Sequence, residues 1–259
     1  EVRRAGRDIT GDISDKADWK PVLEDASTVI HLAARVHEMG SINKKSAAEN
    51  RYFAVNVAAS EHLARAAAQA NIRRLIFLST AKVMGESSAR PLTAQDPVSP
   101  QDFYARSKLE AERAIEDAAG TMEIVILRSP LVYGPYVKGN FLRLMKMIES
   151  GLPIPLGAIS NQRSLIFVRN LADAIKHSIT APTGVYLPTD GEDLSTPDLI
   201  FRLANAMDNP VRLISIPPTL LNICTYLMRR NEEFQKLAGS LQLDGKLPGW
   251  LPPFSVHDG

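Results

Sequence analysis

The chain has little of what stabilises small or exported proteins. Its 259 residues include one cysteine, Cys224, so no disulfide can form within it, and a reducing, cytoplasmic location is expected. Thirty Lys and Arg residues against 29 Asp and Glu residues leave a net charge of +1. This balance gives no electrostatic case for nucleic acid as a main partner. The length allows one or two domains that bury their own core.

Long hydrophobic runs are also missing, so no membrane span is predicted. The most apolar segment, 213–228, is shorter than the ~20 residues that a span needs and contains two prolines and an asparagine. We expect a helix packed on the domain, with the prolines at its start. Because Arg229 and Arg230 follow directly, contact with a membrane surface is the alternative.

Short apolar runs alternate with helical patterns over the first two-thirds of the chain. The runs predict buried parallel strands, and the helical segments are rich in strong helix formers. This alternation is typical of an α/β fold in which helices cover both faces of a parallel sheet. The predicted strands are Ser27–Ala34, Asn71–Leu78 and Met122–Arg128, and the predicted helices are Arg51–Ala70 and Tyr104–Ala119.

After Pro130 the segments become shorter and prolines more frequent. This composition predicts a smaller, loop-rich lobe that interleaves with late strands of the sheet. His31 lies in an apolar run and is expected to be a core residue rather than a metal ligand. The other four histidines show no ligand spacing with cysteine or paired carboxylates, so no metal site is predicted.

Two local patterns suggest chemistry when they are taken together. Tyr104 and Lys108 are four residues apart near a predicted helix start, so both side chains can reach one ligand. A nearby ammonium stabilises a phenolate and lowers the pKa of the tyrosine, which makes it usable as an acid or base. Upstream, Ser79 and Thr80 follow a predicted strand, at the edge where open α/β sheets bind ligands.

With His31-Leu32-Ala33-Ala34, these patterns resemble the extended short-chain dehydrogenase/reductases, in particular the nucleotide-sugar epimerase/dehydratase group. The resemblance covers nearly the whole chain. It implies a Rossmann-type doubly wound parallel sheet with a smaller C-terminal substrate-binding lobe. Residues 1–135 would bind the nicotinamide dinucleotide, and residues 136–259 would form most of the substrate lobe.

The resemblance also assigns ligand-binding positions. It implies NAD or NADP as cofactor and a nucleotide sugar, most simply a UDP-sugar, as substrate. Substrate contacts are expected from Lys82, Asn140, Phe141 and Arg163. Cofactor contacts are expected from Asp12, Ile13, Leu32, Ala33, Ala34, Asn56, Ser79, Tyr104, Lys108, Ser129 and Leu131.

In the implied reaction, Tyr104 exchanges a proton with a sugar hydroxyl while hydride moves to or from the nicotinamide. Lys108 holds the ribose and lowers the pKa of Tyr104, and Thr80 hydrogen-bonds the sugar oxygen. Family 4,6-dehydratases carry an Asp-Glu pair directly after that threonine, where this chain has Ala81 and Lys82, so a dehydratase is rejected. A 4-epimerase of polysaccharide or O-antigen sugar synthesis is expected. The alternatives are an NADPH-dependent 4-ketoreductase and a non-catalytic nucleotide-binding relative.

The chain departs from the family at its front, because it has no G-x-x-G-x-x-G turn to bind a pyrophosphate. Residues 1–5 resemble the second strand of the family, so we expect a further β-α unit ahead of Glu1. Arg3, Arg4 and Arg7 lie where the family meets the ribose 2′-position, which favours NADP. A homodimer packed through the helices 51–70 and 104–119 is also expected from the resemblance.

Overall fold

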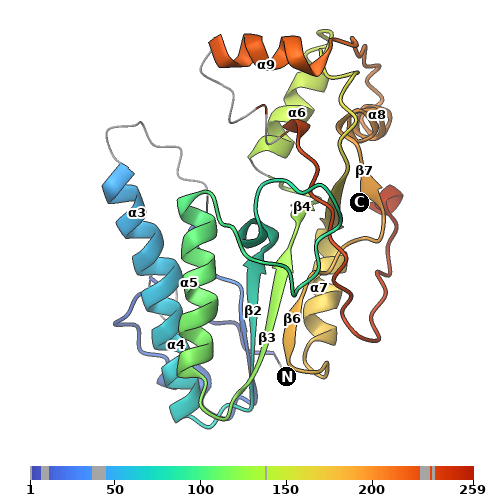
Figure 1. Cartoon of the computed structure of the whole chain (residues 1–259). Coiled ribbons are helices and arrows are strands. Elements are labelled where there is room, and N and C mark those ends of the chain that lie inside the picture. The colour runs from blue at the N-terminus through green and yellow to red at the C-terminus, as the bar shows by residue number, and fades with distance from the viewer. Residues whose placement is uncertain (1, 7–11, 37–44, 138, 228–233, 235–236) are drawn as a thin grey trace.

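A four-stranded parallel sheet forms the centre of the computed structural model, which describes residues 2–6, 12–36, 45–137, 139–227, 234 and 237–259 (Figure 1). Its order is β1-β2-β3-β6. All three neighbouring pairs are parallel, which confirms the α/β fold with a parallel sheet. The strands are β1 (Thr28–His31), β2 (Arg74–Thr80), β3 (Glu123–Ser129) and β6 (Gly184–Tyr186).

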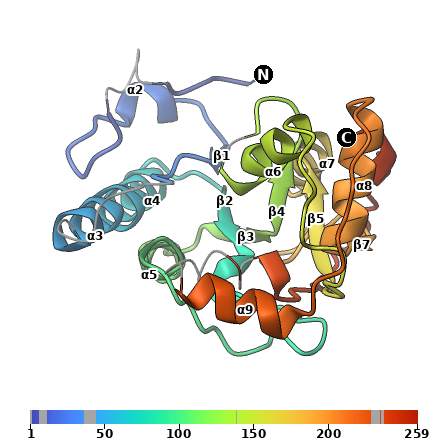
Figure 2. The same ribbon diagram turned by 90° about the horizontal axis from the view of Figure 1, so that it is seen from above.

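Helices cover both faces of this sheet, as Figure 2 shows from above. One face carries a nearly continuous helix, which turns π-helical in η2, and a second helix beside it. The other face carries α7 (Val168–His177). The helices of the first face are α3 (Lys45–Phe53), η2 (Ala54–Ala58), α4 (Ala59–Gln69) and α5 (Phe103–Ala118).

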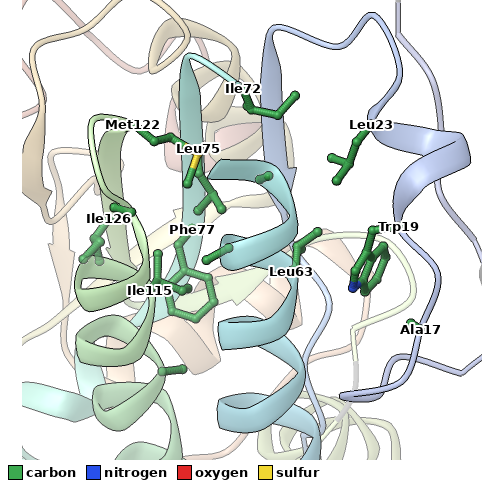
Figure 3. Packing of buried hydrophobic residues seen from close by; sticks show 14 residues of the cluster. Ala17, Trp19, Leu23, Leu63, Ile72, Leu75, Phe77, Ile115, Met122 and Ile126 are labelled. Carbon is green, nitrogen blue, oxygen red and sulfur yellow. The ribbon is translucent and has the colours of Figure 1, made fainter. Parts of the chain in front are cut away.

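The two faces of β2 bury alternate residues, as strand geometry requires. Leu75 and Phe77 point into the cluster beneath α4 and α5, where they meet Leu63 and Ile115 (Figure 3). Ile76 points the other way, into the cluster under α7. All three β2 side chains are completely buried, which explains why this strand is apolar without polar alternation.

A second, three-stranded sheet lies beside the first, in the order β4-β5-β7. Strands β4 and β5 are parallel, and β7 is antiparallel to β5. In the sequence, strand β6 of the first sheet comes between β5 and β7 of the second sheet. The remaining elements are α2 (Lys20–Leu23), η3 (Ala81–Met84), β4 (Leu131–Tyr133), α6 (Asn140–Glu149), β5 (Arg163–Phe167), β7 (Asp193–Leu194), α8 (Thr196–Ala206), α9 (Pro218–Leu227) and η4 (Val256–Asp258).

A buried carboxylate ties the second sheet to the neighbouring helix. Asp190 accepts hydrogen bonds from the hydroxyl of Tyr133 on β4 (2.7 Å), the backbone N–H of Phe167 (2.9 Å) and the amide of Asn170 on α7 (2.6 Å). Burial and the Asp190 carboxylate both raise the pKa of Tyr133 far above its ordinary value. The Tyr133 hydroxyl is therefore a fixed donor in this anchor.

The predicted elements are present, with shifted ends. The predicted helix 51–70 is part of the longer run 45–69, and the strand predicted from Asn71 begins at Arg74. Asn71 has a φ of 55°, the left-handed conformation that closes α4, so it cannot also begin a strand. Of residues 1–5, interpreted as a strand, the described residues 2–5 lie outside any strand. In this segment the side chain of Arg3 donates to the Glu24 carbonyl at 2.9 Å.

The apolar segment near the C-terminus forms a helix that begins at a proline, as expected. On α9, Leu221 is buried in a cluster with residues of α6 and α8, while Leu220, Ile223 and Tyr226 are exposed. Among the described residues, no helix is long and apolar enough to cross a membrane.

Candidate active site

The predicted catalytic residues lie on β2 and on α5, the helix that packs beside this strand. Thr80 ends β2 and pairs in register with Ser129, which ends β3. Helix α5 carries Tyr104 and Lys108 (Figure 1). In an open α/β sheet the carboxyl edge of the strands is the expected ligand site.

Helix α5 begins where Asp102 caps it. Asp102 is extended and its Oδ1 accepts a hydrogen bond from the backbone N–H of Ala105 at 2.7 Å, which satisfies one of the free donors of the first turn. The cap fixes the helix start, so Tyr104 lies in the first turn and Lys108 one turn later. Both are on the side of α5 that meets the sheet.

Lys108 is a deeply buried cation. Its side chain is 1% exposed, and its Nζ lies 3.8 Å from the centroid of the Phe77 ring, a cation–π contact. Burial lowers the pKa of Lys108 to about 7, against the opposing effect of Glu112. Among the described residues, no hydrogen-bond acceptor contacts this Nζ, so the ammonium suits a ligand that brings hydroxyl acceptors.

The hydroxyl of Tyr104 does not have the lowered pKa that the sequence predicts. Burial, the Asp102 carboxylate and the neighbouring Tyr52 together raise the pKa of Tyr104 to about 12. The two tyrosine rings are 6.3 Å apart and tilted. In the protein alone, desolvation of the phenolate outweighs any help from Lys108, and Tyr104 is a phenol at neutral pH.

Thr80 caps a short helix and keeps its hydroxyl hydrogen available for a ligand. It is buried, and its Oγ1 accepts a hydrogen bond from the backbone N–H of Lys82 at 3.3 Å, which caps the short helix η3. A hydroxyl is both donor and acceptor, so accepting this bond leaves its O–H able to donate to a bound oxygen.

Lys82, predicted to contact substrate, forms two ion pairs within the protein. Its Nζ lies 2.8 Å from Oδ2 of Asp102 and 3.0 Å from Oε1 of Glu86. Burial alone would lower the pKa of Lys82, but the Asp102 and Glu86 carboxylates raise it. Lys82 is therefore cationic at neutral pH.

Ser79, predicted to contact the cofactor, already donates its hydroxyl within the protein. It is 2% exposed and donates its O–H to Oε1 of Glu112 on α5. The carboxylate of Glu112 also accepts from Arg128 on β3, whose Nη1 contacts the sulfur of Met84 at 3.0 Å. The sequence interpretation missed Glu112 and Arg128. Their signals were a glutamate one helical turn after Lys108 and an arginine inside an apolar strand.

The loop after β1 is held by Asn56, which was predicted to bind the cofactor. Its Oδ1 accepts from the backbone N–H of Arg35 at 2.7 Å, and its amide donates to the Arg35 carbonyl (3.1 Å) and to Ser107 Oγ (2.9 Å). Asn56 lies in the π-helical turn η2, a local form frequent at functional sites. It positions the loop that contains Leu32, Ala33 and Ala34, of which Leu32 is 51% exposed.

His31 is a core residue, as expected. Its Nε2 is 2.8 Å from Ser60 Oγ, and burial, with a smaller effect of Lys108, lowers its pKa to about 3. No group of three or more potential metal ligands occurs in the described part of the chain.

The remaining predicted contacts are spread around this centre. Asp12 is exposed before α2, and Ile13 packs against the cluster of Figure 3. Ser129 donates to the Ser79 carbonyl at 3.4 Å, and Leu131 is 44% exposed. On the substrate side, Phe141 is buried, and the centroid of its ring lies 6.0 Å from that of Tyr133. Arg163 donates to the Gly239 carbonyl at 2.8 Å, and Asn140 begins α6 with a side chain outside the described part.

The chemical groups of these residues fit a nicotinamide dinucleotide. The buried ammonium of Lys108 suits ribose hydroxyls. The irregular backbone after β1 leaves N–H and C=O groups outside the sheet, and exposed Leu32 offers an apolar surface for a ring. The roles of all the predicted site residues toward ligands stay predictions.

Comparison with known proteins matches this arrangement to a large enzyme family. The model of the NAD dependent epimerase/dehydratase family matches residues 2–188. The UDP-glucose 4-epimerase of Vibrio cholerae is 36% identical over 261 residues, which cover 96% of this chain and 79% of that protein.

Solved structures share the fold. The UDP-glucuronic acid 4-epimerase from Bacillus cereus, in complex with NAD, matches with a TM-score of 0.73 and 20% identity, over 94% of this chain and 75% of that one. The dTDP-4-dehydrorhamnose reductase from Bacillus anthracis, in complex with NADP, matches with a TM-score of 0.71 and 16% identity, over 92% and 81%. Both an epimerase and a reductase thus have this fold.

Proposed function

Because the chain belongs to the NAD-dependent epimerase/dehydratase family, we propose that it is a nucleotide-sugar 4-epimerase acting on a UDP-sugar. The observation that carries the proposal is that Thr80 ends β2 at the carboxyl edge of the sheet, with Ala81 and Lys82 directly after it. Lys108, four residues after Tyr104 on α5, lies over the Phe77 ring of the same strand. The 36% identity to a UDP-glucose 4-epimerase supports the substrate class.

In this proposal the chain moves one proton and orients one sugar oxygen. A bound nicotinamide dinucleotide would supply the hydride acceptor and donor for carbon 4 of the sugar. Tyr104 takes the proton of the 4-hydroxyl group during oxidation and gives it back during reduction. Thr80 donates a hydrogen bond to the same oxygen. Lys108 binds the ribose hydroxyls, and its positive charge favours the phenolate of Tyr104 over the phenol.

The rest of the site would bind and orient. The backbone around Leu32, Ala33 and Ala34, held by Asn56, would line the cofactor, and Arg163 would meet the diphosphate of the sugar nucleotide. Residues 1–135 would then carry most cofactor contacts, and residues 136–259 most substrate contacts. A homodimer packed through α4 and α5 completes the proposal, and light scattering of the purified protein would test it.

A 4-ketoreductase is the second candidate, and one observation favours it. The pKa of Tyr104 is raised to about 12, so the resting side chain is a phenol, the form that donates a proton to a keto oxygen. A reductase needs this form at the start of each turnover, whereas an epimerase begins by removing a proton.

Assays of the full-length protein with each substrate class separate the two candidates. We expect UDP-glucose to be converted to its 4-epimer without added reductant, and nicotinamide dinucleotide to be released when the purified protein is denatured. Turnover only with NADPH and a 4-keto sugar nucleotide would establish the reductase instead. If Tyr104→Phe keeps wild-type activity in either assay, the assignment of the site is wrong.

A further inference from the structure

Lys82 links the two elements that carry the proposed catalytic hydroxyls. Its backbone N–H donates to Oγ1 of Thr80, and its ammonium reaches Asp102 at the start of α5 (2.8 Å). Tyr104 follows Asp102 by two residues. Lys82 therefore contacts Thr80 directly and is connected to the first turn of the Tyr104 helix through the Asp102 carboxylate.

The two oxygens of Asp102 have separate partners. Oδ1 accepts from the backbone N–H of Ala105 and caps α5, while Oδ2 accepts from Lys82. A carboxylate held at both oxygens has a fixed rotamer, so the first turn of α5 is tied to η3. Glu86 holds the same ammonium from its other side at 3.0 Å. Lys82 is 34% exposed in its side chain, so this pair lies at the rim of the site rather than in the core.

We propose that Lys82 is a positioning residue, which holds Asp102 and thereby sets the place and the charge surroundings of the Tyr104 hydroxyl. This inference rests on the proposed function. It replaces the expectation that the Lys82 ammonium contacts the sugar nucleotide.

The charges around Tyr104 make the role testable by pH. Asp102 on α5 and Tyr52 on α3 oppose the Tyr104 phenolate. Lys108 faces the sheet from α5, and Lys82 and Glu86 approach from the η3 segment. Arg163 on β5 lies close enough to Glu86 for their charges to interact. Lys82 offsets the charge of Asp102, so its removal exposes Tyr104 to the full charge of that carboxylate and disfavours the phenolate.

Three variants separate this role from substrate binding. We expect Lys82→Met to move the pH profile of kcat upward by about one unit, the scale of one nearby charge. Below that pKa, kcat falls roughly tenfold, since the phenolate fraction falls tenfold per unit, while KM for the UDP-sugar stays within about twofold. Lys82→Arg keeps the cation and the wild-type profile.

The double variant Lys82→Met/Asp102→Asn tests whether the effect runs through Asp102. Asparagine caps a helix about as well as aspartate but has no charge. We therefore expect the double variant to recover the wild-type profile. A profile that stays shifted contradicts the role of Asp102. A severalfold higher KM for Lys82→Met with an unmoved pH profile overturns the proposal in favour of a direct substrate contact.

A titration independent of turnover keeps this inference apart from the proposed function. The ultraviolet phenolate signal of Tyr104 is obtained by subtracting the Tyr104→Phe variant from the parent protein, with and without Lys82→Met. An upward shift in a protein that epimerises no sugar supports the role of Lys82 while the proposed function fails. An unmoved signal in an active epimerase contradicts the role of Lys82 while the proposed function stands.

Discussion

Arg128 and Glu112 form a buried ion pair directly beneath the candidate site. Nη2 of Arg128 lies 2.7 Å from Oε2 of Glu112, and the residues are 7% and 3% exposed. The pair joins β3 to α5, and Ser79 of β2 donates to the same carboxylate. One glutamate thus holds three elements whose ends carry the proposed chemistry.

Removing one partner of this pair is expected to be costly. Glu112→Ala leaves the Arg128 guanidinium buried without its carboxylate, which we expect to lower the free energy of unfolding by about 3–5 kcal/mol in urea titrations. Glu110→Ala is the matched control, because its pair with Arg113 is exposed and worth about 0–1 kcal/mol. Equal losses in the two variants would contradict this account.

Lys108 is expected to destabilise the free protein at neutral pH. Its pKa is lowered to about 7, so the folded state binds fewer protons than the unfolded state between pH 7 and its ordinary pKa of 10.5. Stability from this group therefore rises with pH across that window. We expect Lys108→Met to raise the free energy of unfolding at pH 7 by on the order of a few kcal/mol, measured by urea titration. The variant should also lose activity. Exposed Lys176→Met serves as the control and should change neither.

His31 gives a second pH dependence of the same sign. Its folded pKa is lowered to about 3, so stability is present above its ordinary pKa of 6.5 and is lost as the pH falls toward 3. We expect the melting temperature to fall between pH 6.5 and pH 4.5, and to fall less in His31→Gln. The exposed His257→Gln variant should follow the wild type. A slope that is the same in His31→Gln would assign it to other groups.

Asn56 is expected to control cofactor affinity through the loop that it holds. Asn56→Ala removes three hydrogen bonds and leaves the Arg35 backbone groups without this partner, at about 1–3 kcal/mol for a buried group. We expect weaker NAD binding by calorimetry, about tenfold at 1.4 kcal/mol, with the helix content unchanged. Asn56→Asp keeps the acceptor but loses the amide donor, so its affinity for NAD should lie between those of the wild type and Asn56→Ala.

The strands and helices of the first sheet could be predicted because local signals agree with the fold. The apolar run around Phe77 is buried on both faces, and Asp102 is a strong N-cap directly before the Tyr104 helix. Such signals depend on residues that are close in sequence. The ends of α4 and β2 were less predictable, since the left-handed Asn71 set them.

The partners of individual side chains were not predictable in this way. Ser79, Lys82 and Phe141 were each expected to meet a ligand, and the contacts that their side chains make with Glu112, Asp102 and Tyr133 were not foreseen. Each of these partners lies on an element that the sequence alone does not bring near. Residue type limited the chemistry of each site residue, and folding selected its partner.

The sequence by itself determined the alternation of elements, the family resemblance, and the positions of Thr80, Tyr104 and Lys108 at a strand end and a helix start. These depend on spacing, capping and apolar periodicity within short segments. Only the tertiary structure decided the ionisation of those groups, because burial and charges from distant segments set it. The spacing of Tyr104 and Lys108 on one helix predicts a lowered pKa for Tyr104, but burial, Asp102 and Tyr52 raise this pKa in the folded protein. A pKa depends on every neighbour in space, and most of those neighbours are remote in the chain.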